Sequence, residues 1–265
     1  MSTLLLLSPL SGQAIPLSDS PDPAFAAGMI GAGLAIDPDI GELRAPCAGV
    51  IAATHASGHA LTVRSDNGAD VLIHLGVDTV NLRGTGFTAH VREGQRVAAG
   101  DKLVSFDIAA IRPKVSSMVS MIVVANGDAF GVAQLVTNGK VNFGDPLLNV
   151  LPNGQAAVVK AVDGGISTAA TFTVLLRLAY GLHARPAAQL AHAARLHAGP
   201  VTVTANGRTA NAKSVVALVA LGTRFNDKLD IRVEGEGADA VADSLFDLIL
   251  AGLGDPIAEG PAAAP

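Results

Sequence analysis

A change of pattern near residue 150 constrains the fold of this chain more strongly than any other feature of its sequence. Before that point, short apolar or alternating runs are separated by turn residues, as at Asp66-Asn67-Gly68 and Gly100-Asp101. After Thr171, strand-like runs alternate with runs whose apolar residues recur at helical spacing. The stretch between them is rich in Pro, Asn, Gly, Gln, Ala, Ser and Thr and has no sustained periodicity. The pattern predicts domains at residues 1–150 and 170–254, a linker at 151–169, and a tail or second linker at 255–265.

The two regions predict different fold classes. Short strands at close turn spacing, beginning with residues 4–7, favour an all-β sandwich or barrel-like first domain with one helical turn within 107–114. The second region predicts a β-α-β-β-α-β-α order, which is typical of an α+β open-faced sandwich. Its expected strands are 172–178, 201–205, 208–211 and 229–234, and its expected helices are 184–196, 214–221 and 238–251.

The composition of the 265 residues excludes several classes of protein. The net charge is −5, Trp is absent and Tyr is single, so the basic patches and stacking platforms of nucleic-acid binders are missing. The single cysteine, Cys47, cannot form an internal disulfide, which fits a reducing compartment. The apolar start lacks a basic region and is broken at Ser8-Pro9, far short of the ~20 residues of a membrane span. We expect a cytoplasmic protein without membrane insertion.

Two histidines of the first region fall on one predicted hairpin. Residues 59–65 and 69–75 flank the turn at 66–68. If residues 66 and 67 form the loop, His59 lies directly opposite His74, with Cα atoms about 5 Å apart. If residues 67 and 68 form it, Leu61 lies opposite His74 and His59 is its diagonal neighbour. Either register brings the imidazoles together.

The spacing leaves three chemical interpretations open. Paired imidazoles suit a phosphoryl acceptor beside a hydrogen-bonding partner, because the attacking nitrogen must be unprotonated while its neighbour can donate to phosphate. They also suit a metal, although a catalytic zinc normally has a third protein ligand, and a zinc hydrolase is therefore disfavoured. Both side chains could equally be surface or structural histidines.

Seven short motifs of the first region stand in a recognisable order and spacing: Leu7-Ser8-Pro9-Leu10-Ser11-Gly12, Pro21-Asp22-Pro23-Ala24-Phe25-Ala26, Ala45-Pro46-Cys47-Ala48-Gly49, Gly58-His59-Ala60, Ile73-His74-Leu75-Gly76-Val77-Asp78-Thr79-Val80, Gly84-Thr85-Gly86-Phe87 and Glu93-Gly94-Gln95-Arg96-Val97. In these motifs the first region resembles the glucose-type enzyme IIA of the bacterial phosphotransferase system over about residues 4–150. This resemblance implies His74 as phospho-acceptor and His59 as the partner that stabilises its phosphate and assists onward transfer. Ser57 keeps a hydroxyl where the family often has Thr, and Asp78 matches a position at the active face.

A further histidine, His183, directly precedes a predicted helix. First-turn N–H groups of a helix have no intrahelical acceptors, so a phosphate on His183 would meet an anion site, with Arg185 beside it as a fork of donors. A capping histidine with a solvated arginine is the alternative. The run Tyr180-Gly181-Leu182-His183-Ala184-Arg185-Pro186-Ala187 resembles the phosphohistidine signature of the phosphocarrier HPr, and the resemblance covers about residues 170–254. It implies His183 as phospho-carrier and Arg185 as its phosphate-stabilising partner.

Other polar residues have weaker assignments. Ser214 begins a predicted helix; its counterpart in some relatives of HPr is phosphorylated, but a plain N-cap explains a serine there equally well and is preferred. His192 and His197 fall on the first predicted helix of the second region, and His55 and His90 lie in the first, all without a partner motif. We expect these four histidines to be surface or structural residues.

The resemblances together imply a transfer chain within a sugar phosphotransferase system. Enzyme I, charged by phosphoenolpyruvate, loads His183, and the phosphoryl group passes to His74 and then to a IIB component of a sugar permease with its IIC partner. No tightly bound cofactor or metal is expected. The alternative is a regulatory binding protein whose partners depend on its phosphorylation state. The chain could be a piece of a multiphosphoryl transfer protein with enzyme I downstream, and its sequence does not specify glucose or N-acetylglucosamine.

Overall fold

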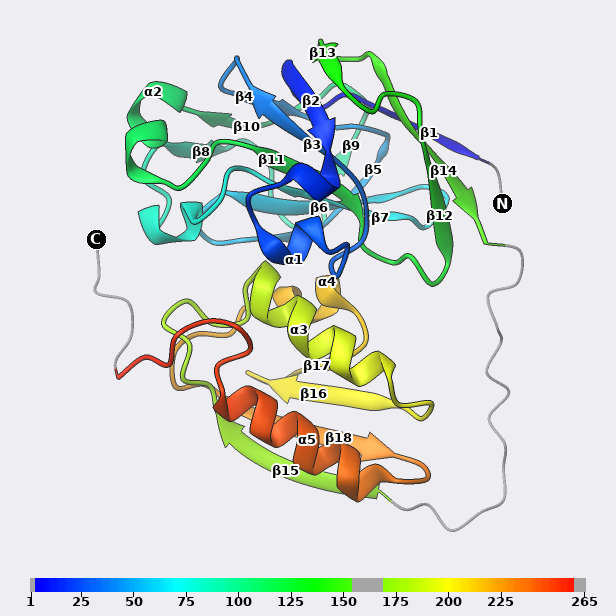
Figure 1. Ribbon diagram of the computed structural model, residues 1–265, viewed down its shortest axis with the longest axis vertical. Coiled ribbons are helices and arrows are strands. Elements are labelled where there is room, and N and C mark those ends of the chain that lie inside the picture. The colour runs from blue at the N-terminus through cyan, green and yellow to red at the C-terminus, as the bar shows by residue number, and fades with distance from the viewer. Residues whose placement is uncertain (1–2, 154–168, 260–265) are drawn as a thin grey trace. The chain divides into compact units, whose positions relative to one another are not determined.

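The computed structural model describes residues 3–153 and 169–259, which form two compact units spanning Met1–Ala156 and Ala157–Pro265. Each unit is described by itself. The predicted linker at 151–169 lies largely outside the described residues. Figure 1 shows strands throughout the first unit and a mixture of helices and strands in the second. The predicted pair of fold classes, all-β followed by α+β, is confirmed.

The first domain is built from fourteen short strands in three sheets. The largest sheet has the order β13-β2-β3-β11-β7-β6-β5-β9, and the smaller two are β1-β14-β12 and β4-β10-β8. The strands are β1 Leu4–Leu7, β2 Gly12–Pro16, β3 Ala32–Pro38, β4 Glu42–Arg44, β5 Gly49–Thr54, β6 Ala60–Ser65, β7 Asp70–His74, β8 Phe87–Ala89, β9 Arg96–Val97, β10 Lys102–Phe106, β11 Ser120–Val124, β12 Phe130–Gln134, β13 Gly139–Val141 and β14 Pro146–Pro152.

Burial follows the position of each strand in the large sheet. All residues of the central strands β7 and β11 are buried, so both faces of the sheet are covered there, whereas β5 alternates between buried and half-buried residues. The core is mainly aliphatic, with Leu6, Leu34, Ile51, Ile73 and Ile122 among its members. Burial of these side chains is the main force that fixes β7, the strand that ends in His74.

Short helical turns connect several strands of the first domain: η1 Leu17–Asp19, α1 Pro23–Ala26, η2 Thr79–Leu82, α2 Ile108–Ile111 and η3 Arg112–Lys114. The turn predicted within 107–114 is confirmed as α2 and η3. Helix α1 was not predicted, although Asp22 is a good N-cap and Pro23 a good first residue. The carboxylate of Asp22 accepts hydrogen bonds from the backbone N–H groups of Ala24 and Phe25.

The second domain is a four-stranded antiparallel sheet with three helices on one face (Figure 1). Its sheet order is β15-β18-β16-β17, and alternate strand residues such as Val174, Val203 and Ile231 are buried. The elements are β15 Ala169–Leu175, α3 Ala184–Arg195, β16 Val201–Ala205, β17 Arg208–Asn211, α4 Val215–Ala220, β18 Lys228–Glu234 and α5 Ala238–Leu250.

Two details of the second domain show where local sequence signals hold and fail. The Asn206-Gly207 turn is confirmed, with both residues in the left-handed region at φ 53° and 73°. Strand β15 begins three residues earlier than the sequence predicts, because pairing with β18 continues to Ala169 opposite Glu234. Ala and Thr carry little apolar signal, so only the partner strand reveals that these residues are paired.

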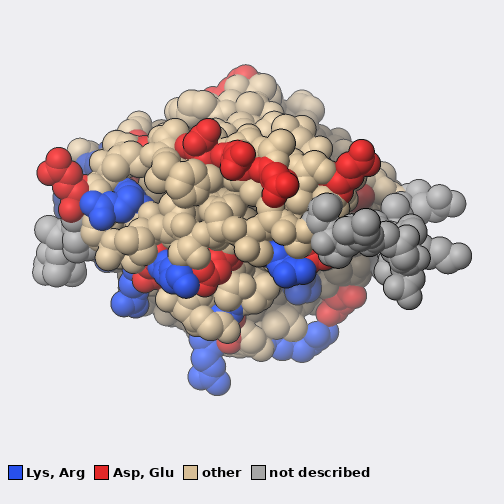
Figure 2. Space-filling view, turned by 90° about the horizontal axis from the view of Figure 1, so that it is seen from below, with Lys and Arg blue, Asp and Glu red and all other residues tan. Residues whose placement is uncertain are grey.

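The charged residues do not gather into a basic field on the face that Figure 2 shows, where Lys and Arg are interspersed with Asp and Glu among the described residues. Across 3–153 and 169–259, no helix is both long enough and apolar enough to cross a lipid bilayer.

Candidate phosphoryl-acceptor sites

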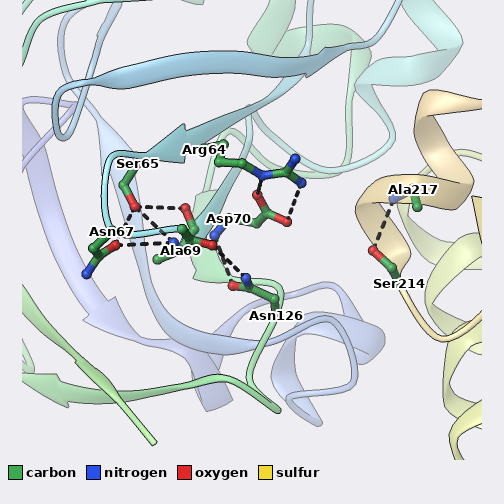
Figure 3. A network of polar contacts seen from close by, with 9 residues as sticks. Arg64, Ser65, Asn67, Ala69, Asp70, Asn126, Ser214 and Ala217 are labelled. Atoms are coloured by element: carbon green, nitrogen blue, oxygen red, sulfur yellow. Dashed lines mark hydrogen bonds and ion pairs between the residues drawn. The ribbon is translucent and has the colours of Figure 1, made fainter. Parts of the chain in front are cut away.

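The β6–β7 hairpin turns through a three-residue loop, so both predicted registers are wrong. Ser65 pairs with Ala69, whose N–H donates to the Ser65 hydroxyl at 3.0 Å, and Asn67 accepts within the same turn (Figure 3). Gly68 adopts a φ of 93°, which a glycine reaches without strain. This loop sets Ala60, rather than His59 or Leu61, opposite His74.

The two imidazoles nevertheless meet, as either predicted register required. The His59 and His74 ring centroids lie 4.8 Å apart, with the ring planes at 77°. His59 precedes the first residue of β6 and follows Gly58, which has a φ of 71°. The direction of its side chain is therefore not set by the alternation of side chains between the two faces of the strand. Both histidines are buried, at 0% and 7% exposure.

Hydrogen bonding fixes which nitrogen of His74 carries the proton. Nδ1 lies 2.8 Å from the carbonyl oxygen of Gly76, and a carbonyl can only accept, so the proton is on Nδ1 and the lone pair of the neutral ring is on Nε2. The N–H of Gly76 in turn donates to the Ser120 hydroxyl at 3.2 Å. The Phe25 ring of α1 packs 5.5 Å from the His74 ring. Backbone and packing together orient the His74 ring with its lone pair on Nε2.

A third histidine, His55, which we expected to be a surface or structural residue without a partner motif, contacts the side chains of this site. The Ser57 hydroxyl lies 2.7 Å from Nδ1 of His55 and 2.5 Å from Nδ1 of His59. The His55 and His59 rings meet edge to face, with centroids 4.5 Å apart. The alternation His55-x-Ser57-x-His59 at a turn is the sequence signal that could have revealed the contact.

Asp78 supports the loop that follows His74. Its backbone is in the left-handed region at φ 62°, and its carboxylate accepts a hydrogen bond from the Ser116 hydroxyl. The neighbouring Val77 N–H donates to the Ser117 carbonyl at 2.8 Å. These bonds attach the loop after β7 to the segment that leads into β11.

The second site lies where the chain enters α3. His183 is the N-cap residue in an extended conformation, and its carbonyl accepts from the Ala187 N–H at 3.0 Å. Gly181 precedes it at φ 70°, and a Cβ there would lie 1.8 Å from the carbonyl oxygen of Thr223. The Leu182 N–H donates to the Thr223 hydroxyl at 2.9 Å. Only glycine can make this approach, which places His183 at the helix start.

Asp255 contacts both side chains predicted for the second site. Its Oδ2 lies 2.6 Å from Nε2 of His183, and its Oδ1 lies 3.4 Å from Nη1 of Arg185. Burial opposes ionisation, but the hydrogen bond from His183 and the nearby charges of His183 and Arg185 lower the pKa of Asp255 below its usual value. A carboxylate can only accept, so Nε2 of His183 carries a proton, and whenever the ring is neutral its lone pair is on Nδ1.

The start of the predicted tail is therefore part of the second site. Leu253 is fully buried, and the N–H of Ala258 donates to the carbonyl of Arg177 at 2.8 Å. These contacts return the chain across the domain after α5 and bring Asp255 to a histidine 72 positions earlier. Sequence spacing offers no signal for such a distant contact.

Ser214 and the three remaining histidines lie outside both candidate sites. Ser214 caps α4, because its hydroxyl accepts from the Ala217 N–H at 3.2 Å (Figure 3). The prediction that His197 lies on α3 is wrong, because the helix ends at Arg195. His197 follows this end, and its Nε2 donates to the Glu234 carbonyl at 2.8 Å. His90 is exposed beside the Ser105 hydroxyl, and His192 is exposed on α3. Among the described residues, no three His, Cys, Asp or Glu side chains are grouped to hold a metal ion.

Comparison with protein families gives one match in each domain. The family model described as phosphoenolpyruvate-dependent sugar phosphotransferase system, EIIA 1, matches residues 4–130. The model described as PTS HPr component phosphorylation site matches residues 170–250. Each match includes the histidine pattern described for its domain.

Known proteins whose names include an EIIA component are similar to about half of the chain. The chain is 46% identical over 125 residues to a glucose-specific EIIA component of Oceanobacillus iheyensis, covering 47% of this chain and 76% of that relative. It is 42% identical over 150 residues to a mannose-specific EIIBCA component of Corynebacterium glutamicum, covering 57% of this chain but only 22% of that much longer relative. Among solved structures, it is similar to the glucose permease IIA of Mycoplasma capricolum, with 34% identity and a TM-score of 0.53, covering 56% of this chain and 96% of the other.

Proposed function

The chain belongs to the EIIA 1 family of the phosphoenolpyruvate-dependent sugar phosphotransferase system and joins to that domain an HPr domain, and from this premise we propose that it relays phosphoryl groups from His183 to His74. A phosphocarrier role in sugar transport follows from the two families. The acceptor atoms, their order and the proteins on either side are the proposal. The observation that carries it is the fixed proton on each ring, which leaves Nδ1 of His183 and Nε2 of His74 as nucleophiles.

Loading of His183 is the first step. The lone pair of Nδ1 forms a bond to the phosphorus of a phosphohistidine on enzyme I, while the donor P–N bond breaks and its electron pair returns to the donor ring. Enzyme I takes its phosphoryl group from phosphoenolpyruvate. Asp255 stays hydrogen-bonded to Nε2, and the start of α3 offers N–H groups and a favourable dipole to the new phosphate. The Arg185 guanidinium, which donates to Asp255, can instead donate hydrogen bonds to the phosphate oxygens.

Transfer to His74 repeats the same displacement. Nε2 of His74 attacks the phosphorus on His183, and the electron pair of the broken P–N bond returns to Nδ1 of His183. The proton stays on Nδ1 of His74, hydrogen-bonded to the Gly76 carbonyl, throughout. His59, 4.8 Å away between ring centroids, supplies a donor to the phosphate. Tethering the two carriers in one chain raises the local concentration of each near the other, so transfer within the chain needs little intrinsic affinity.

The phosphoryl group then passes to a IIB component of a sugar permease. Support comes from the EIIBCA relatives, whose names combine IIB, IIC and IIA components in one protein. The sugar is selected by those partners rather than by either acceptor site.

Incorporation of phosphate from phosphoenolpyruvate in the presence of enzyme I tests the relay. We expect two acid-labile phosphates on the parent by intact mass, one on His74→Gln and none on His183→Gln. Substitutions His90→Ala and His192→Ala remove an exposed histidine from each domain and serve as matched controls that keep both labels. Label on His74 in the His183→Gln variant would contradict the order, and an unlabelled parent would refute the relay.

A further inference from the structure

The turn between β5 and β6 places three side chains of the first acceptor site in line. The His55 N–H donates to the carbonyl of Ala60 at 2.8 Å, and the Gly58 N–H donates to the carbonyl of His55 at 2.8 Å. These bonds close the loop and hold His55 and His59 at its two ends. Ser57, which is buried, lies between them.

One hydroxyl proton is shared among the three side chains. Ser57 Oγ contacts Nδ1 of His55 and Nδ1 of His59, at 2.7 and 2.5 Å, so it can donate to only one of them. The backbone N–H of Ser57 also points at Nδ1 of His55, at 3.3 Å. A nitrogen that receives this N–H carries a lone pair, and Nδ1 of His55 is therefore the acceptor of the hydroxyl proton as well. The remaining contact requires Nδ1 of His59 to donate to Ser57 Oγ.

We infer that His55 is a positioning residue of the first acceptor site, which acts through Ser57 to fix the proton of His59 on Nδ1. This inference rests on the proposed role of His74 as phosphoryl acceptor. With Nδ1 committed to Ser57, the nitrogen of His59 that serves the phosphate on His74 is Nε2.

The direction of the hydrogen bonds from His59 to Ser57 and from Ser57 to His55 decides whether His59 can become a charged donor to the phosphate or only a neutral one. Because Nδ1 keeps its proton, binding a second proton at Nε2 makes His59 an imidazolium, and a charged donor bonds phosphate about twice as strongly as a neutral one. Without an acceptor at position 55, the Ser57 hydroxyl would donate to Nδ1 of His59 instead. His59 would then be a neutral Nε2–H donor with no charge to offer.

Substitution of His55 by Asn or by Ala distinguishes its role as a hydrogen-bond acceptor from its role in packing. The contact of the Ser57 N–H with a side-chain acceptor two residues earlier is the geometry that Asn makes in an Asx turn. In His55→Asn the carbonyl oxygen takes the place of Nδ1 and can accept from both the N–H and the hydroxyl of Ser57. In His55→Ala neither bond can form.

Long-range ¹H–¹⁵N correlation spectra of the full, unphosphorylated chain with labelled histidine report the protonated nitrogen of His59 directly. We expect Nδ1–H in the parent and in His55→Asn, and a shift to Nε2–H in His55→Ala. An unchanged His59 tautomer in His55→Ala would overturn the inference, as would a His55→Asn spectrum that matches that of His55→Ala. His90→Ala, which removes a histidine beside another serine hydroxyl, is the control and should leave His59 unchanged.

Transfer kinetics add a second readout. We expect phosphoryl transfer from His183 to His74 to be about ten- to a hundredfold slower in His55→Ala, which is the scale of the effects of residues that orient the ligands of metal sites. His55→Asn should recover most of the rate. Equal rates in the parent and His55→Ala would overturn the role in transfer. Failure of the parent to load His74 would refute the proposed function, and the tautomer spectra would still decide the role of His55.

Discussion

Asp255 holds the Nε2 proton of His183 across 2.6 Å, from a position 72 residues later in the chain. A carboxylate in this position fixes the tautomer of an imidazole and raises the basicity of the other ring nitrogen, as it does in catalytic triads and in metal-bound histidines. In the relay proposed above, the contact would prepare Nδ1 of His183 for attack on phosphorus. The same carboxylate also contacts Arg185, at 3.4 Å.

We predict that Asp255→Asn slows the loading of His183 by enzyme I by at least about tenfold, because the amide can hydrogen-bond either tautomer and no longer favours a lone pair on Nδ1. Single-turnover phosphorylation measured by rapid quench checks this. Asp243→Asn, which changes an exposed carboxylate on α5, is the matched control and should load at the parental rate. Equal rates for both variants would show that Asp255 does not orient the ring.

The stability of the second domain should depend on pH through the same residue. The pKa of Asp255 is lowered in the folded state, so its contribution to stability is present above the ordinary aspartate pKa of about 3.9 and is lost as the pH falls through the lowered pKa. The difference in unfolding free energy between the parent and Asp255→Asn, on the order of 1 kcal/mol, should be largest above about pH 5 and shrink below about pH 4. Tyr180 is the only tyrosine and Trp is absent, so intrinsic fluorescence during denaturant unfolding reports this domain. A difference that grows in acid would contradict the assignment.

Gly181 should tolerate no side chain. Its left-handed φ costs a non-glycine residue about 1 kcal/mol, and the clash of a Cβ with the Thr223 carbonyl adds to this, so we expect Gly181→Ala to lose at least about 2 kcal/mol of unfolding free energy. Gly207→Ala has a similar φ of 73° but nothing within 4 Å of its Cβ, and should lose only about 1 kcal/mol. Tyrosine fluorescence compares the two. Equal losses would mean that the Thr223 contact yields without cost.

The ion pair between Arg64 and Asp70, next to the β6–β7 turn, should stabilise the first domain. Arg64 binds both carboxylate oxygens of Asp70, at 2.7 and 3.0 Å (Figure 3), and the Asp70 side chain is only 6% exposed. Arg64→Ala leaves that carboxylate without the guanidinium, and we expect a loss of about 1–2 kcal/mol in the calorimetric transition of this domain. The Arg96–Asp66 pair is exposed on both sides, so Arg96→Ala should cost less than about 0.5 kcal/mol. Similar losses would show that burial of Asp70 gives the pair no advantage.

The amino-acid sequence by itself determined the two fold classes and nearly every element of the second domain, because apolar periodicity and turn residues encode which face of a segment is buried. Helix α3 and strands β16 and β17 lie where their patterns predict them. Both candidate acceptors came from short motifs that resemble those of known phosphocarrier families, because the spacing of the residues alone left their roles open. Helix α1 was missed, although its signal, Asp22 before Pro23, is local.

Tertiary structure decided the proton on each ring. The turn between β6 and β7 has a loop of three residues where the sequence predicted a loop of two, and this loop set Ala60 opposite His74. The Gly76 carbonyl, the Ser57 hydroxyl and the Asp255 carboxylate then fixed which imidazole nitrogens carry protons. A ring nitrogen is protonated or not according to the single group that faces it, and a group that arrives from a turn or from 72 residues away leaves no periodic trace in the sequence. The motifs identify the histidines, but their chemistry depends on the folded chain around them.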